Sequence, residues 1–252
     1  MHLGEEAARY GLKLHLGKTK ILTNVSALTR PETVLAGEQS IAVLGPADAE
    51  RYLGRKLTLD TYHEAELANR IAAGWASFHK NKHVLSNRNC SLGRRLKAFD
   101  ALITPKVLYG CASWTMWADS ERRLRSARRS MLRKMIAVGR RHDEPWVEYI
   151  QRATHRCERL AKEHRLQEWV NLQRHRKWDF AGKCARLPHD RWSKRVLSWV
   201  PWFRCNTKRQ VGRPTKRWSD DIAAIAGRDW MSAAKEKERW HALQARYINR
   251  EI

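Results

Sequence analysis

The residues that could support metal chemistry begin with two adjacent aspartates, Asp220 and Asp221. Paired carboxylates hold magnesium in enzymes that transfer phosphoryl groups. Such pairs usually lie in a tight turn between apolar strands, whereas this pair precedes a helical pattern formed by Ile222, Ile225 and Gly227. We therefore interpret the two aspartates as capping residues whose charge suits the positive end of a helix dipole.

Histidine and cysteine residues do not form a recognisable metal signature either. His79 and His83 have half of a metal-ligand spacing, and Cys184, His189 and Cys205 are grouped without the spacing of a zinc site. The chain also contains no Walker loop, no GxGxxG turn, no GxSxG elbow and no HExxH pair. We therefore expect no metal site and no cofactor in this chain.

Cysteine usage and hydropathy indicate the compartment. The five cysteines are widely spaced and odd in number, which favours free thiols in a reducing environment. No apolar run approaches the roughly 18–20 residues of a membrane span, and residues 1–10 lack the apolar region of a signal peptide. We expect an intracellular protein, nuclear or cytoplasmic, that is not secreted and has no membrane partner.

The charge of the chain is unevenly distributed. Its 252 residues include 50 Lys+Arg and 26 Asp+Glu, which gives a formal net charge of +24. Residues 1–70 contain nine of each kind, so the excess lies entirely in residues 71–252, with 41 basic and 17 acidic residues. Because 42% hydrophobic residues and 12 Trp can fill a core, disorder is a poor explanation of the basicity. A polyanion is the expected partner, and nucleic acid is the first candidate.

One basic helix is expected over residues 119–138. Leu124, Ala127, Met131 and Met135 form its apolar face, and Gly139 is the expected end. The other faces carry Arg122, Arg123, Arg125, Arg128, Arg129, Arg133 and Lys134. We interpret the basic side of this helix as a contact surface for phosphates, with Arg122, Arg125, Arg128, Arg129 and Arg133 as binding residues. The alternative is a solvated helix face.

A second basic segment covers residues 201–218 and is typical of an extended linker. It contains six basic residues and no acid between Phe203 and Ser219: Arg204, Lys208, Arg209, Arg213, Lys216 and Arg217. A Gly-Arg-Pro core at 212–214 can place an arginine in a narrow minor groove, although Val211 stands where that motif has another arginine. We expect Arg209, Arg213, Lys216, Arg217 and Trp218 to contact nucleic acid. Most tryptophans fall on apolar stripes, but Trp202 and Trp218 could stack on bases.

These residues must be positioned by an α+β fold. We expect a helix over 5–10 that ends at Gly11, a strand over 12–25 with a turn near Gly17, a hairpin of 33–35 with 41–44, and a strand over 52–59. The apolar period then becomes helical. The expected organisation is a β-containing part (1–60), a helical region (61–140) and a basic helical region (141–252) with the 201–218 linker.

The order of short motifs resembles the C-terminal part of the reverse transcriptase of a non-LTR (LINE-type) retrotransposon. The motifs are GLKLHLGKTKI at 11–21, YLG at 52–54, PKVLYG at 105–110 with Trp114, residues 178–187, GRP at 212–214 with KRW at 216–218, DDI at 220–222, Gly227, Trp230 and Arg239-Trp240. The resemblance implies the end of the polymerase palm, followed by a thumb over 61–140 and a C-terminal tail.

The resemblance also implies roles for individual residues. Lys18 would be the remnant of a proton-donor lysine near the leaving pyrophosphate, and Lys18 and Lys20 would both contact nucleic acid. Tyr52, Leu53 and Gly54 would help to hold the primer terminus. The catalytic (Phe/Tyr)-x-Asp-Asp hairpin of the family is absent from residues 1–252. Mg²⁺ is therefore expected only for an intact polymerase, with the upstream palm and fingers as a missing portion.

The sequence thus predicts a fragment of an RNA-directed DNA polymerase that retains nucleic-acid binding and is inactive alone. Phosphoryl transfer needs the metal-binding carboxylates, because the metal neutralises charge in the transition state. One alternative is a stand-alone architectural protein that binds RNA or DNA through residues 203–218. Another is a nonfunctional retroelement relic. RNA, DNA and a hybrid duplex all remain open as partners.

Overall fold

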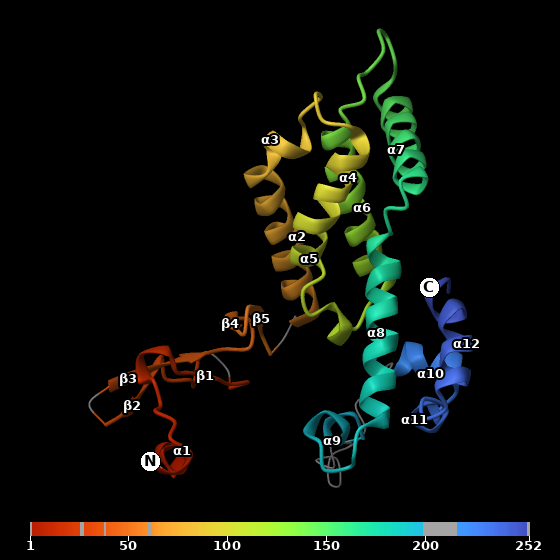
Figure 1. The fold of residues 1–252 in the computed structure, drawn as a ribbon. Coiled ribbons are helices and arrows are strands. Elements are labelled where there is room, and N and C mark those ends of the chain that lie inside the picture. Colours follow the sequence, from red (N-terminus) through yellow and green to blue (C-terminus); the bar gives the residue numbers. More distant parts are fainter. Residues whose placement is uncertain (1, 26–27, 38, 60–61, 199–215, 251–252) are drawn as a thin grey trace. The chain divides into compact units, whose positions relative to one another are not determined.

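The computed structural model describes residues 2–25, 28–37, 39–59, 62–198 and 216–250 (Figure 1). Its elements are, in chain order, α1 (His2–Arg9), the 3₁₀ helix η1 (Leu16–Lys18), β1 (Lys20–Leu22), β2 (Thr33–Ala36), β3 (Gln39–Leu44), β4 (Glu50–Tyr52), β5 (Arg55–Leu57), α2 (Tyr62–Lys80), α3 (Lys82–Leu85), α4 (Leu92–Leu102), α5 (Thr104–Val107), the 3₁₀ helix η2 (Cys111–Ser113), α6 (Ala118–Ile136), α7 (Trp146–Glu163), α8 (Trp169–Arg186), α9 (Trp192–Ser198), α10 (Asp220–Ala226), α11 (Trp230–Ala233) and α12 (Lys237–Ile248). Strands precede a longer series of helices, which confirms the α+β class.

The described chain forms two compact units, Met1–Asn69 and Arg70–Ile252. The division falls within α2 and almost coincides with the point where the sequence becomes basic. The boundary between a thumb-like region and a tail at residue 140 stays a prediction, and residues on both sides of it belong to the second unit. No helix among the described residues is long and apolar enough to cross a membrane.

The N-terminal unit is built on a sheet of order β1-β3-β2. β2 and β3 form the expected antiparallel hairpin, with Gly37 at a positive φ of 66° in the turn. β1 pairs in parallel with β3 over Lys20–Leu22. Within β3 the alternate residues Ile41 and Val43 are buried, as the two-residue period of a strand requires.

Two strand predictions in this unit are wrong. Residues 12–15 are not a strand, because only 20–22 find a sheet partner and the alternating leucines Leu12 and Leu14 remain exposed. The strand expected over 52–59 is instead the hairpin of β4 and β5. Leu53 and Gly54 both have positive φ, 48° and 77°, the backbone that joins two strands with a two-residue turn. An apolar alternation shows neither where a strand stops nor where it folds back.

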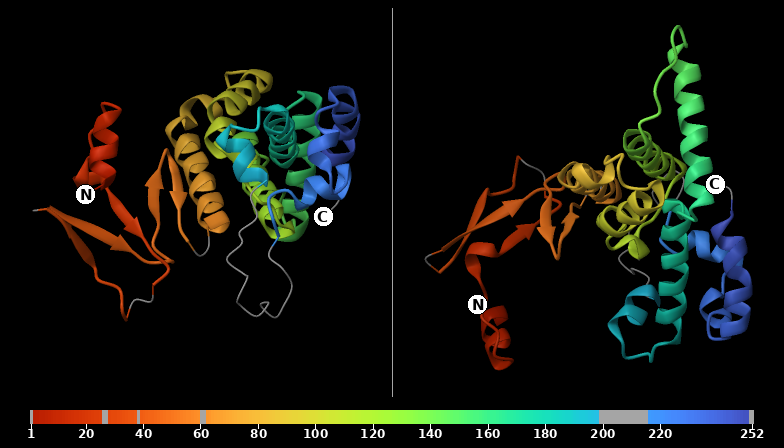
Figure 2. Two further views of the ribbon diagram at one scale, coloured as in Figure 1. Left: turned by 90° about the horizontal axis from the view of Figure 1, so that it is seen from below. Right: turned by 45° about the horizontal axis from the view of Figure 1, so that its top comes forward.

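The C-terminal unit is entirely helical in its described residues. α6 packs against α7 and α8, and α8 also packs against α11 and α12, while α10 packs against these two helices (Figure 1). α12 also lies beside α8 in the two further views of Figure 2. α8 is therefore the element that joins the arginine-rich helix α6 to the C-terminal helices.

The centre of this unit is a cluster of aromatic rings. The rings of Trp178 on α8 and Trp240 on α12 are stacked, with centroids 3.9 Å apart and planes 13° apart. Each indole N–H donates to the backbone carbonyl of the other residue, at 3.1 and 3.2 Å. Tyr247 and Trp230 pack around them, and all four are buried. For these tryptophans the prediction of core packing is confirmed, and the polar edges of both stacked indoles are satisfied.

The basic helix ends earlier than expected. α6 covers Ala118–Ile136, and it is followed by Ala137 in the left-handed conformation, two residues before Gly139, which was the expected end. Leu124, Met131 and Met135 are fully buried, which confirms the predicted apolar face. The periodicity predicted the buried face correctly, because that face depends on side-chain type and not on the last turn.

Candidate nucleic-acid interface

The arginines of α6 fall into two groups, and the first serves the fold. Arg129 Nε donates to Glu158 on α7 at 2.6 Å, and Arg133 Nη1 donates to the Thr154 hydroxyl at 2.9 Å. Arg128 is buried and donates to the backbone carbonyl of Leu166 at 3.3 Å. Burial lowers the pKa of the Arg128 guanidinium, while nearby carboxylates partly offset this effect. These three arginines join α6 to α7 and the segment that follows it.

Arg122 and Arg125 form the second group, near the start of the helix. Arg122 is largely exposed and pairs with Asp119 at 2.8 Å, an i,i+3 contact of small stabilising effect. Arg125 Nη2 donates to Glu121 at 3.2 Å. No hydrogen bond joins the Nε or Nη1 of Arg125 to the described part of the chain. Of the five predicted phosphate-binding arginines of α6, these two pair only with acids of their own helix, with side chains 75% and 38% exposed, whereas Arg129, 44% exposed, is bonded to α7.

The end of the basic linker returns to the start of α6. Lys216 Nζ donates to the Met116 carbonyl at 2.7 Å, two residues before α6 begins. The indole N–H of Trp218 donates to the Ala112 carbonyl at 2.9 Å. Arg217 is exposed beside them. The structure thus brings Lys216, Arg217 and Trp218 to the end of α6 that carries Arg122 and Arg125, a proximity that their separation of about 90 positions does not reveal.

Arg209 and Arg213, the other predicted residues of the linker, lie outside the described residues, as do Trp202 and most of the 201–218 segment. Trp218 is only partly buried, but it packs edge-on to Phe180 and Trp230 within the aromatic core. Its single donor is already used by Ala112. Base stacking by Trp218 stays a prediction, and its described contacts are those of a docking residue.

A buried ion pair lies directly behind Arg125. Arg174 on α8 and Glu121 on α6 are each about 2% exposed, and Arg174 makes a two-pronged contact with Glu121 at 2.8 Å. Its remaining Nη1 donates to the carbonyls of Ile248 and Arg250, at 2.7 and 2.6 Å. Every prong of this guanidinium therefore has a partner, which a buried charge requires. The pair fixes the C-terminal end of α12 against α6 and α8.

A second buried network surrounds Asp221. Its carboxylate receives the Lys177 ammonium at 2.9 Å, the Tyr247 hydroxyl at 3.0 Å and the Arg250 guanidinium at 2.8 Å. Burial lowers the pKa of Lys177 to about 8, against the opposing attraction of Asp221. Burial, and then the negative charge of Asp221, raise the pKa of Tyr247. The Arg250 plane also lies 3.8 Å from the centre of the Tyr247 ring.

The two aspartates therefore do different things. Both aspartates lie in the first turn of α10, as the helix-dipole interpretation expects, but the capping interpretation is wrong, because the N-cap is Ser219 and no side chain makes a capping hydrogen bond there; Asp220 instead accepts the backbone N–H of Arg217 at 2.7 Å. Asp221, however, is a buried counter-ion, which the sequence interpretation missed. A signal was present, because Arg174 and Lys177 share a stripe of α8 with Trp178, and cations on an apolar stripe need a buried acid. Among the described residues no group of three or more His, Cys, Asp or Glu could hold a metal ion.

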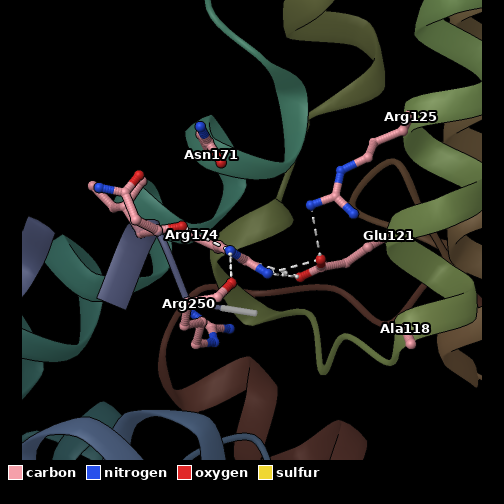
Figure 3. Close-up of a pocket in the computed structure, with 8 residues that line it drawn as sticks. Ala118, Glu121, Arg125, Asn171, Arg174 and Arg250 are labelled. Carbon is pink, nitrogen blue, oxygen red and sulfur yellow. Dashed lines mark hydrogen bonds and ion pairs between the residues drawn. The ribbon is translucent and has the colours of Figure 1, made fainter. Parts of the chain in front are cut away.

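Between these networks lies a cavity of about 480 Å³ (Figure 3). It is lined by residues from the start of α6, from α8 and from the C-terminal end of α12: Ala118, Glu121, Arg125, Asn171, Arg174, Ile248, Asn249 and Arg250. Figure 3 shows the Arg125 and Arg174 guanidinium groups, from α6 and α8, turned toward the same Glu121 carboxylate. Three arginines and one carboxylate line this cavity, so its charge favours an anion.

The predicted residues of the N-terminal unit lie in two segments, one formed by η1 and β1 and the other by β4 and the turn after it. Lys18 is exposed at the end of η1, and Lys20 in β1 forms an ion pair with Glu50, the first residue of β4. The hydrogen bond from Lys20 lowers the pKa of Glu50. Tyr52, Leu53 and Gly54 occupy the end of β4 and the turn that follows. Lys20 thus contacts the first residue of β4, and the Tyr52–Gly54 turn begins at the last residue of the same three-residue strand.

Exposed tryptophans were not singled out from the sequence. Trp192 is 75% exposed at the start of α9, with the Arg195 guanidinium 5.3 Å from its ring centre. Trp146 is 62% exposed at the start of α7 and packs against Tyr149. Sequence alone cannot separate these indoles from the buried ones, because all of them recur at helical spacing.

Comparison with known proteins gives one informative match. The chain is similar to a protein of Caenorhabditis elegans whose name describes it as uncharacterized and transposon-derived, with 29% identity over 251 residues. The matched region covers 96% of this chain and 85% of that protein. No protein-family model matches the chain, and no solved structure matches it. The similarity supports a transposon origin for the chain.

Proposed function

We propose that this chain is the C-terminal part of a non-LTR retrotransposon reverse transcriptase and that its own activity is to bind nucleic acid. The motif order from residue 11 to Trp240 supports the parentage, and the similarity to a transposon-derived protein agrees with it. In this proposal residues 1–60 correspond to the end of the palm, 61–140 to the thumb and 141–252 to the tail, and the first of these boundaries lies close to the division between the two compact units. The exposed apolar side chains of the first unit would be covered in an intact polymerase.

One observation supports the binding function most strongly: basic residues from three separate segments meet at the start of α6. Arg122 and Arg125 of α6 and Lys216 and Arg217 of the C-terminal part lie toward solvent there, and behind them the buried Arg174 and Lys177 of α8 and Arg250 are paired with Glu121 and Asp221. The acids in the same place are Asp119, Glu121, Asp220 and Asp221, and each already has a partner. The excess of positive charge there is therefore not neutralised by the fold.

Binding through such a surface is expected to follow the phosphate backbone. Contacts to phosphates position a protein without reading sequence, and each contact releases counter-ions. We expect affinity that tolerates changes of base sequence and falls steeply with salt. Because the metal-binding aspartates of the family are absent from residues 1–252, we expect no nucleotide incorporation by this chain with Mg²⁺ or Mn²⁺.

The test is a fluorescence-anisotropy titration of labelled RNA, DNA and hybrid duplexes across a range of salt concentrations. The affinity is expected to fall linearly on a double-logarithmic plot, with a slope of about −0.9 for each phosphate contact. Replacing Arg122 and Arg217 together by glutamine should reduce the slope by about 2. The matched control replaces two exposed basic residues of α7, Arg156 and Lys162.

The control pair is expected to leave the slope almost unchanged. A binding curve that is flat between low and physiological salt would contradict the proposal. An equal loss in both double variants would contradict the location at α6, because binding would then follow total charge alone. A stand-alone architectural protein would be indicated if replacing Arg213, Lys216 and Arg217 abolished binding while replacing Arg122 and Arg125 did not.

A further inference from the structure

The cavity between α6, α8 and the C-terminal end of α12 has the features of a site for a single phosphate group. Its volume of about 480 Å³ lies within the range of small-ligand sites, about 300–1,000 Å³. A row of surface arginines can follow a duplex without any cavity, whereas this open cavity is lined by residues from three elements (Figure 3). We propose that it binds the terminal phosphate of a nucleic-acid strand or of a nucleotide, an inference that rests on the proposed function.

The donors that could hold a phosphate are present and uncommitted. Arg125 spends one nitrogen on Glu121, so its Nε and Nη1 are open to a ligand, without partners in the described part of the chain. Asn171 lines the cavity from α8, and its side-chain amide makes no hydrogen bond within the described residues. A guanidinium and an amide arranged around one space can bind two or three phosphate oxygens together.

The start of α6 adds a further contribution. Ala118, the first residue of the 19-residue helix α6, lines the cavity, and the side chain at the N-cap position makes no capping hydrogen bond. The first N–H groups of a helix lack intrahelical partners and carry part of the positive end of the helix dipole. An anion in the cavity would therefore meet backbone donors as well as Arg125.

The buried ions make the site rigid and keep it positive. Arg174 is held by Glu121 and by two carbonyl groups at the end of α12. Its charge offsets the negative end of the α12 dipole, which would otherwise repel a phosphate. Arg250, fixed by Asp221 and by the Tyr247 ring, closes the opposite wall. With Arg125, Arg174 and Arg250 opposed by Glu121, the lining has a net charge of +2.

The experiment compares a 5′-phosphorylated single-stranded oligonucleotide with the same oligonucleotide bearing a 5′-hydroxyl group. The wild-type chain is expected to bind the phosphorylated strand about tenfold more tightly, the effect of a few charge-assisted hydrogen bonds. Replacing Arg125 by glutamine should abolish this difference. The matched control is Arg122→Gln, which removes the same charge from the same helix outside the cavity. It should weaken both strands equally and preserve their ratio.

Additional measurements identify the source of the phosphate and provide a second variant in case the first one is destabilised. Inorganic phosphate and adenosine 5′-monophosphate are titrated as competitors. Binding of inorganic phosphate by wild type but not by Arg125→Gln would assign the cavity to the free phosphate ion, and binding of adenosine 5′-monophosphate alone would assign it to a mononucleotide. Asn171→Ala is a second variant if Arg125→Gln lowers the unfolding midpoint. A 5′-phosphate preference that survives in both Arg125→Gln and Asn171→Ala would overturn the inference, as would a wild-type chain with neither preference nor competition.

The failure of this inference is distinguishable from the failure of the proposed function. Salt-dependent duplex binding without a 5′-phosphate preference would leave the proposed function intact and remove the site. Binding of adenosine 5′-monophosphate without any duplex binding would do the reverse.

Discussion

The two compact units of this chain contain similar kinds of apolar residues, but they bury them to very different extents. In the described residues of Met1–Asn69 the buried apolar side chains are those of Ile41, Val43 and Leu67. Many others of that unit are exposed, including Leu28 at 96% and Leu35 at 74%. In the described residues of Arg70–Ile252 five tryptophans, Trp114, Trp169, Trp178, Trp230 and Trp240, are at most 5% exposed. Apolar content alone does not make a core; a second layer must cover the first.

The two units also differ in net charge, and the unit with the larger buried core is the strongly basic one. Residues 1–69 hold eight basic and nine acidic residues, a net charge of −1, while residues 70–252 hold 42 basic and 17 acidic residues, a net charge of +25. In the second unit part of the basic charge is structural: Arg128, Arg129, Arg133 and Arg174 hold helices together. Only the remainder is available to a polyanion. Net charge therefore overstates the positive charge that the proposed binding surface can offer.

The largest expected effect tests the contrast between the two cores. Trp178→Ala removes a fully buried ring and its stacking on Trp240, so we expect a loss of about 3–5 kcal/mol in the free energy of unfolding. Leu35→Ala removes an exposed side chain of the first unit and should change it by less than about 0.5 kcal/mol. Urea unfolding followed by tryptophan fluorescence and circular dichroism measures both. Similar losses in the two variants would break the contrast.

The buried ions give the next effect. Asp221→Asn leaves Lys177 and Arg250 without their counter-ion, so we expect a loss of about 3 kcal/mol at pH 7. The half-exposed Asp48, which pairs with Arg30 at 3.5 Å in the first unit, is the matched control. Asp48→Asn should cost less than about 1 kcal/mol. Equal costs would show that the Asp221 network is as solvated as the surface pair.

The loss of stability in Asp221→Asn is expected to become smaller as the pH rises. The folded-state pKa of Lys177, about 8, is below its unfolded value of roughly 10.4, so the unfolded chain binds the extra proton between these values. The contribution of Lys177 to stability therefore rises with pH across that window. Without Asp221 the pKa falls further and the rise begins at lower pH. The gap between wild type and Asp221→Asn should narrow from pH 7 to about pH 9.5, and a constant gap would contradict a charged Lys177 at neutral pH.

These networks mark the limit of what the sequence could predict. Helix faces such as Leu124, Met131 and Met135 were predicted correctly, because burial follows the helical period. The turn at Leu53 and Gly54 was missed, since a two-residue turn leaves the apolar alternation on both sides unchanged. The partners of Arg128 and Arg174 could not be predicted either, because they lie 38 to 76 positions away and are chosen by helix packing. Lys216 meets Met116 across 100 positions for the same reason.

A glycine-to-alanine substitution should have opposite signs in the two units. A Cβ at Gly182 would lie 2.5 Å from Nε1 of Trp240, so Gly182→Ala forces the aromatic core apart. We expect a loss of about 1–3 kcal/mol. Gly4 lies in α1, and a Cβ added there would meet no described atom within 4 Å, so Gly4→Ala should be neutral or stabilise that helix by up to about 1 kcal/mol. Thermal unfolding of the two variants measures the signs, and destabilisation by both would contradict an open surface around Gly4.

The smallest effect concerns the connection between α6 and α7, where arginine again serves the fold. Two hydrogen bonds from Arg152, at 2.6 and 2.7 Å, and then the Arg141 backbone N–H lower the pKa of Glu144 to about 2. Because the folded-state pKa is depressed, the stabilisation is complete above about pH 4.5 and is lost as pH falls toward 2. Glu144→Gln should therefore lower the melting temperature by about 2 °C at pH 7, with the gap to wild type closing in acid. The exposed Glu148 on α7 is the control, since Glu148→Gln removes the same charge from a side chain that has no ion pair within the described residues. Equal shifts from the two variants at pH 7 would mean that Arg152 acts through the overall field of the basic unit, and Arg152 would then join the arginines available to a polyanion.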